Sequence, residues 1–70
     1  MTEKMPRTAI LRQKLEVLRS EHRDLDTAIV AMEDVLRPDL LALRRLKKRK
    51  LALKDEIARI EDEITPDIIA

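Results

Sequence analysis

The sequence predicts an all-α protein: a two-helix antiparallel coiled-coil hairpin that assembles further into a four-helix bundle. Three observations support this fold class. The 70 residues include no Gly and no aromatic residue, and 41% are charged, which disfavours a sheet and its turns. Each half of the chain carries an apolar run at heptad spacing. The two runs also share one register, which indicates that they face each other.

The first heptad run lies in the N-terminal half. Its members recur at alternating spacings of four and three, so they share one side of a helix. They are Leu11, Leu15, Leu18, His22, Leu25, Ile29, Met32 and Leu36. We therefore predict a helix over residues 8–36, preceded by a flexible leader at residues 1–7.

A short break follows at Arg37-Pro38-Asp39. Proline disfavours a helical residue before it, and Asp39 is a good N-cap for a helix that follows. We predict a turn at residues 37–39, a second helix at 40–64 and a C-terminal tail at 65–70, where Thr65-Pro66 ends the helix. So short a connection favours antiparallel neighbours.

The second heptad run tests that topology. It contains Leu43, Leu46, Lys50, Leu53, Ile57, Ile60 and Ile64. In an antiparallel hairpin, the residue numbers of facing pairs have a constant total. When this total is 75, every a position faces a d position, from Met32 with Leu43 to Leu11 with Ile64. This shared register favours the hairpin strongly.

Charges beside the two runs agree less well with the hairpin. The attractive neighbours expected are Asp26 with Lys47, Arg12 with Glu61, and Lys14 with Glu63. The repulsive neighbours expected are Arg19 with Lys54 and Glu21 with Glu56. Because exposed ion pairs contribute little to stability, this mixture does not decide the topology.

Composition also narrows the function. There is no Cys and only one His, so we expect no disulfide, no metal site and no nucleophile–base pair, and hence neither an enzyme nor a cofactor. No uncharged apolar stretch is long enough to span a membrane, and the N-terminus lacks a signal-peptide core. We expect a cytoplasmic protein that self-associates, since two helices of this length enclose little core.

A polar layer interrupts the apolar seam. His22 and Asp26 are four residues apart on one helix, and the register places Lys50 beside them. One interpretation is that the layer fixes register and partner number, as buried polar a residues do. The other is a pH-sensitive or ligand-binding site, because His titrates near neutrality. We favour the first, since a hairpin offers little concavity.

A basic run begins the second helix. The candidate patch for an anionic partner is Arg44, Arg45, Lys47, Lys48 and Arg49. Such runs suggest nucleic acid or anionic membrane headgroups. The charges ring the helix, however, no aromatic residue is interleaved, and an acidic segment follows. We therefore favour a solvated helix face that also attracts an acidic partner.

Apolar residues outside the seam concentrate toward the turn. Exposed apolar patches commonly mark interfaces. We predict self-association through Val35, Leu40 and Leu51, with a dimer favoured over larger assemblies.

Two stretches resemble a known family. LKKRKLALKDEIARI (Leu46–Ile60) and EHRDLDTAI (Glu21–Ile29) are similar to motifs of the YdcH-like family of small bacterial proteins, a domain of unknown function. The resemblance implies a cytoplasmic, oligomeric helical hairpin and no established activity. The SlyX-like family of small bacterial coiled coils is less similar.

The functional prediction is a non-enzymatic coiled-coil interaction or adaptor protein with an unidentified protein partner. The alternative is a nucleic-acid-associated protein that binds duplex backbone through residues 44–50. Association with anionic membranes ranks third.

Overall fold

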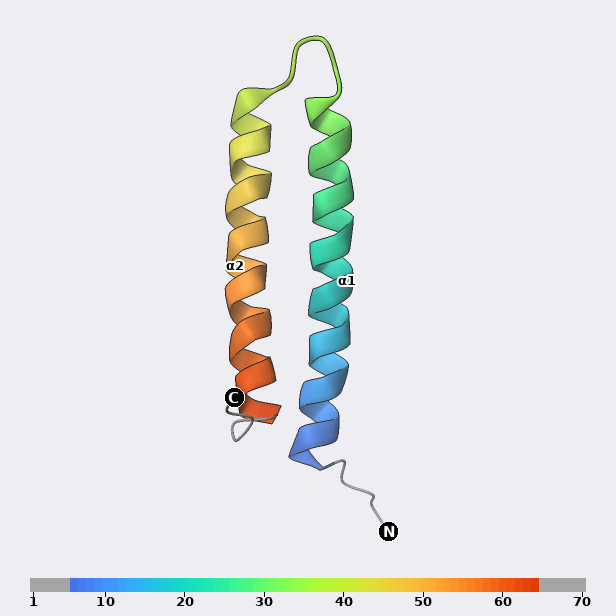
Figure 1. The fold of residues 1–70 in the computed structure, drawn as a ribbon, viewed down its shortest axis with the longest axis vertical. Coiled ribbons are helices and arrows are strands. Elements are labelled where there is room, and N and C mark those ends of the chain that lie inside the picture. Colours follow the sequence, from blue (N-terminus) through green and yellow to red (C-terminus); the bar gives the residue numbers. More distant parts are fainter. Residues whose placement is uncertain (1–5, 65–70) are drawn as a thin grey trace, which may run out of the picture.

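The computed structural model describes residues 6–64 and contains two helices, α1 (Arg7–Glu33) and α2 (Leu40–Ile64). They run antiparallel and lie side by side along their length (Figure 1). The predicted two-helix hairpin is confirmed. The leader expected at residues 1–5 and the tail expected at 65–70 lie outside the described residues. We call the end with the connecting segment 34–39 the turn end and the other the open end.

Helix α1 begins one residue before the predicted Thr8. Pro6 precedes its first turn, and the Pro6 carbonyl accepts a hydrogen bond from the backbone N–H of Ile10 at 3.1 Å. Proline is tolerated here because its missing N–H would have no helical partner in any case. Arg7 therefore belongs to the helix and not to the predicted leader.

The C-terminal end of α1 corrects the prediction. The helix ends at Glu33 and not at Leu36, so the connection has six residues, 34–39, instead of three. The Leu36 side chain is 97% exposed. In the register of total 75, the residue opposite Leu36 is Asp39, which caps α2. Leu36 has no apolar partner there, so continuing the helix through it would bury nothing.

Helix α2 begins where the sequence indicates. The Asp39 carboxylate accepts a hydrogen bond from the Ala42 backbone N–H at 3.1 Å, and the Asp39 carbonyl accepts one from the Leu43 N–H at 2.9 Å. The side-chain bond satisfies an N–H group that has no partner within the first turn of a helix. The N-cap predicted for Asp39 is confirmed.

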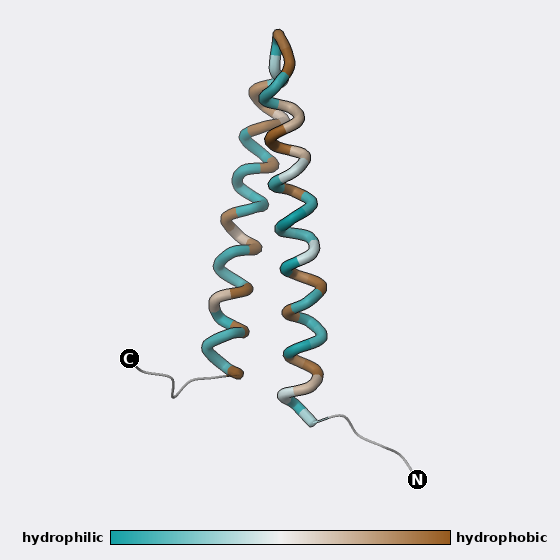
Figure 2. Tube along the Cα trace, turned by 45° about the vertical axis from the view of Figure 1, so that its right-hand side comes forward, coloured by the Kyte–Doolittle hydropathy of each residue, from teal (hydrophilic) through white to brown (hydrophobic). Residues whose placement is uncertain are grey.

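The core is an apolar seam between the helices, and hydrophobic residues, brown in Figure 2, recur along both helices. The six buried side chains all come from the two heptad runs. They are Leu15, Leu18, Ile29, Leu43, Leu53 and Ile60. Leu53 is completely buried. Burying a Leu or Ile side chain contributes about 1.5–3 kcal/mol, so these six residues provide most of the stabilisation of the hairpin.

The rest of the seam is only partly covered. Leu11, Leu25, Ile57 and Ile64 pack against the core but keep some exposure. Two helices cover each other along one line, and both sides of that line stay open to solvent. The hairpin therefore presents two flanks, and the charged residues beside the seam occupy them.

Candidate functional site

We name the two flanks by the heptad positions beside the seam. The e flank carries the residues at e: Arg12, Arg19, Asp26 and Glu33 of α1, and Leu40, Lys47, Lys54 and Glu61 of α2. The g flank carries the residues at g: Arg7, Lys14, Glu21 and Ala28 of α1, and Ala42, Arg49, Glu56 and Glu63 of α2. Ion pairs cross between the helices on both flanks.

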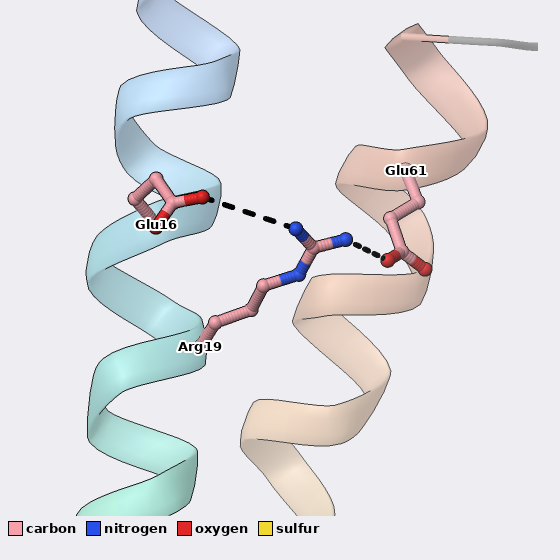
Figure 3. A network of polar contacts seen from close by, with 3 residues as sticks. All are labelled: Glu16, Arg19 and Glu61. Carbon is pink, nitrogen blue, oxygen red and sulfur yellow. Dashed lines mark hydrogen bonds and ion pairs between the residues drawn. The ribbon is translucent and has the colours of Figure 1, made fainter.

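On the e flank, Arg19 connects the two helices. Its guanidinium donates to Glu61 of α2 with an N–O distance of 2.6 Å and approaches Glu16 of its own helix at 3.9 Å (Figure 3). Nearer the turn, the Lys47 ammonium lies 2.8 Å from the Glu33 carboxylate. In both cross-helix pairs the residue numbers total 80.

On the g flank, Arg7 contacts Glu63 at 2.6 Å and Arg49 contacts Glu21 at 3.5 Å. The residue numbers of these pairs total 70. The mean of the two totals is 75, the register predicted for the seam. An e residue follows d by one position and a by four, whereas a g residue precedes a by one position and d by four. The ion pairs therefore confirm the predicted register from both sides.

These pairs correct the expected charge neighbours. Arg19 lies against Glu61 and not against Lys54, and Glu21 lies against Arg49 and not against Glu56. Helical side chains point toward their own N-terminus. On the e flank of an antiparallel hairpin, two such side chains point toward each other when their backbone positions are offset along the helix axis by about five residues. On the e flank the sequence-based offset of two residues ignored this direction; on the g flank, side chains with the same preference diverge, so it does not explain the Glu21–Arg49 pair.

With the observed totals of 80 and 70, the charges favour this register of the hairpin more strongly than the sequence-based neighbours suggested. Two further position pairs share these totals, Asp26 with Lys54 and Lys14 with Glu56, and both are opposite in sign. Among the described residues, every charged e–e or g–g position pair is therefore opposite in sign. Exposed pairs contribute about 0.2–1 kcal/mol each, so their main effect is to select this register over others.

The predicted polar layer is partly assembled. The Lys50 ammonium donates to the Asp26 carboxylate at 2.6 Å, and the Lys50 side chain is 35% exposed. Lys50 therefore extends from its seam position to the charged group on the e flank. The Lys50 hydrogen bond and charge lower the pKa of Asp26 below its ordinary value, with a smaller contribution from His22.

His22 lies next to this pair without joining it through a hydrogen bond. Its Nε2 atom is buried and has no hydrogen-bond partner among the described residues. Buried polar atoms are seldom left unpaired, because desolvation without a hydrogen bond is unfavourable. The layer thus consists of one ion pair and one unsatisfied imidazole, and its role in setting register stays a prediction.

The basic run separates into two groups. Lys47, Arg49 and Lys50 contact carboxylates of α1, as described above. Arg44, Arg45 and Lys48 are exposed and contact no carboxylate among residues 6–64. The second group lies at b, c and f: Arg45 and Lys48 lie on the outer side of α2, and Arg44 lies at the edge of a hollow that it lines with Glu33 and Leu40. Its three cations form one outward patch, whereas the sequence suggested charges all round the helix.

The residues predicted for self-association are all exposed. Val35 lies in the connecting segment, Leu40 begins α2, and Leu51 lies three helical turns further on. Sequence reasoning missed that Leu36 joins them, since its heptad spacing suggested a seam residue. Among the described residues, no three His, Asp or Glu side chains gather as a metal site. Neither helix is long and apolar enough to cross a bilayer.

This geometry defines a class, the small all-α proteins built from one helical hairpin. Residues 15–61, more than half of the chain, match the family described as "Protein of unknown function (DUF465)". The chain belongs to this family, which includes the YdcH-like small helical proteins, so the resemblance predicted from the two motifs is confirmed. No curated protein and no solved structure matches the chain.

Proposed function

We propose that this hairpin is a non-enzymatic interaction module of the bacterial cytoplasm that self-associates, as a dimer, and presents charged surfaces to a protein partner. The observation that supports the proposal best is a cluster of exposed apolar side chains at the turn end. Val35, Leu36, Leu40 and Leu41 are 52%, 97%, 74% and 66% exposed.

An exposed cluster of this kind is costly for an isolated hairpin. Contiguous apolar patches on soluble proteins commonly mark interfaces, because covering them releases ordered water. The hairpin also buries only six apolar side chains among residues 6–64. A second copy would add core to a fold that has little of its own.

The available chemistry supports a binding role and not catalysis. With no Cys and one His, the chain supplies few of the groups that nucleophilic or general-base catalysis uses. The His22 imidazole lines a groove that Glu61 also lines, and its Nε2 atom neither accepts nor donates a hydrogen bond among residues 6–64. We therefore assign the exposed surfaces, and not a pocket, to function.

Light scattering on a size-exclusion column tests self-association. At tens of micromolar we expect the mass of a dimer, twice 8.2 kDa. Leu40→Glu places a charge in the turn-end cluster and should shift the population toward monomer. Val17→Glu is the matched control, because Val17 is also an exposed apolar residue, 62% exposed, but lies on α1 near the open end. A monomeric wild-type protein would contradict the proposal.

A second candidate function is binding to the duplex nucleic-acid backbone. The observation that favours it is the outward patch of Arg44, Arg45 and Lys48, whose charges are not neutralised by described carboxylates. Phosphate contacts need only cations within reach and weaken steeply with salt. Lys48→Glu should abolish such binding, whereas Arg23→Glu on the outer face of α1 should not. Duplex binding that is absent at low salt would eliminate this candidate.

A further inference from the structure

Within residues 6–64, the e flank has three hollows spaced from the open end to the turn end, whereas the g flank has one, lined by Glu21, Leu25, Ala28 and Arg49 among others. One hollow at the open end is lined by Leu15 and Ile64. A second at mid-length is lined by Leu51, Ile57 and Ala58, and a third at the turn end by Leu40 and Leu43. Partly buried seam residues and exposed apolar residues thus form a groove that one further layer of helices would fill.

Charges line this groove in a pattern that complements itself. At the turn end, Lys47 of α2 pairs with Glu33 of α1, and toward the open end Glu61 of α2 pairs with Arg19 of α1. Consider a second hairpin facing this flank, related by a two-fold axis parallel to the helices. Its α1 lies opposite α2 of the first copy, so Glu33 of one copy faces Lys47 of the other. The opposite charges that match within one hairpin then match again between copies.

The same symmetry covers the part of the apolar cluster that lies on the e flank, Leu40. An axis parallel to the helices brings the two turn ends together, so Leu40 of each copy lies beside the axis. The opposite orientation, with turn ends apart, would leave both clusters exposed and place Lys54 near Lys50 and Lys54 of the second copy. In that arrangement, lysine side chains of the two copies would lie close together in a partly desolvated site, where the repulsion between like charges is unfavourable. Charge and apolar surface therefore favour the same orientation.

We propose that a second copy of this chain docks on the e flank, with the two turn ends together, to form a four-helix bundle in which every neighbouring pair of helices is antiparallel. This inference rests on the proposed self-association and specifies its surface and symmetry. The interface is isologous, so each copy contributes the same residues. Leu40, Leu51 and Ala58 become buried, and the polar layer of each copy lies within the bundle.

Two matched variants test the surface by sedimentation equilibrium. Ala58→Glu places a charge in the mid-length hollow, four residues after Lys54. Ala52→Glu makes the same change four residues after Lys48, at an exposed position that lines none of these hollows. Both substitutions add a Lys–Glu pair at i,i+4, but position 58 has one more acidic neighbour and one fewer basic neighbour three or four residues away, so urea unfolding of each variant is measured alongside to separate helix stability from dimer stability. We expect Ala58→Glu to weaken the dimer by about tenfold or more and Ala52→Glu to change it by less than about twofold.

The outcomes of these measurements distinguish failure of self-association from failure of the e-flank interface. A monomeric wild-type protein would contradict self-association altogether. A wild-type dimer that both variants weaken equally, or that neither weakens, would overturn the e-flank interface and leave self-association intact.

Spin labels test the orientation. The chain has no Cys, so Arg37→Cys carries a single nitroxide at the turn end. With turn ends together, we expect a label-to-label distance below about 25 Å. With turn ends apart, the 25 residues of α2, at about 1.5 Å each, would separate the labels by about 40 Å or more and overturn the proposed symmetry.

Discussion

The two flanks of the hairpin share one pattern of opposite charges across the helices but differ in their apolar surface. On both, the charged e–e and g–g position pairs within residues 6–64 are opposite in sign, which favours this register of the hairpin. The g flank carries Ala28 and Ala42 near the turn, has one hollow lined by Leu25 and Ala28, and carries no exposed Leu. The e flank carries Leu40 and Leu51 beside three hollows. Charge pairing therefore helps to select the register of the hairpin, and apolar exposure distinguishes the side available to a partner.

The largest expected effect on stability comes from a substitution in the seam, compared with one on the flank. Leu53 is fully buried and Leu51, two residues away, is 64% exposed. Leu53→Ala should lower the free energy of unfolding by about 2–5 kcal/mol, since it leaves a cavity in a small core. Leu51→Ala should cost less, and its cost should grow with protein concentration because burial of Leu51 is linked to dimerisation. Urea unfolding at two concentrations measures both, and a concentration-independent loss at Leu51 would contradict its place in the interface.

A smaller effect is expected from the e-flank ion pair. Arg19→Glu would place three carboxylates together with Glu16 and Glu61 and should destabilise the hairpin by up to about 1 kcal/mol. The charge swap with Glu61→Arg should restore part of the loss. A double-mutant cycle followed by thermal unfolding measures the coupling. If the swap restores nothing, the pair does not help to select the register.

The polar layer should make stability depend on pH on the acidic side. The pKa of Asp26 is lowered in the folded state by Lys50, so folding favours its ionised form. This stabilisation is present above the unfolded-state pKa and is lost as the pH falls through the lower folded-state pKa. Asp26→Asn should remove that part of the acid dependence. Carboxyl chemical shifts in an NMR titration measure the pKa, and an Asp26 value at or above the ordinary one would contradict the Lys50 contact.

The smallest effect is expected on the g flank. Arg49 lies 3.5 Å from Glu21, and both side chains are about half exposed. Arg49→Ala should change the free energy of unfolding by less than about 0.5 kcal/mol and leave the dimer unaffected. Unfolding and sedimentation of this variant provide the check. A clear loss of dimer would assign the interface to the g flank.

Most of the fold could be predicted from the sequence, because heptad spacing, Pro38 and Asp39 are local signals with direct structural consequences. The helix end at Glu33 was missed because spacing alone continues to Leu36, whereas burial requires a facing residue. The charge pairs were misplaced because side-chain direction depends on three-dimensional geometry. For the same reason, the division of the basic run into paired and outward cations needed the structure.

The most direct test of the account is an isotope-filtered NOE experiment on a mixture of labelled and unlabelled copies. It reports only contacts between different molecules. We expect intermolecular NOEs to the methyl groups of Leu40, Leu51 and Ala58 and none to that of Ala52. NOEs confined to Ala52 or Val17, or no intermolecular NOE in a sample that sediments as a dimer, would contradict assembly through the e flank.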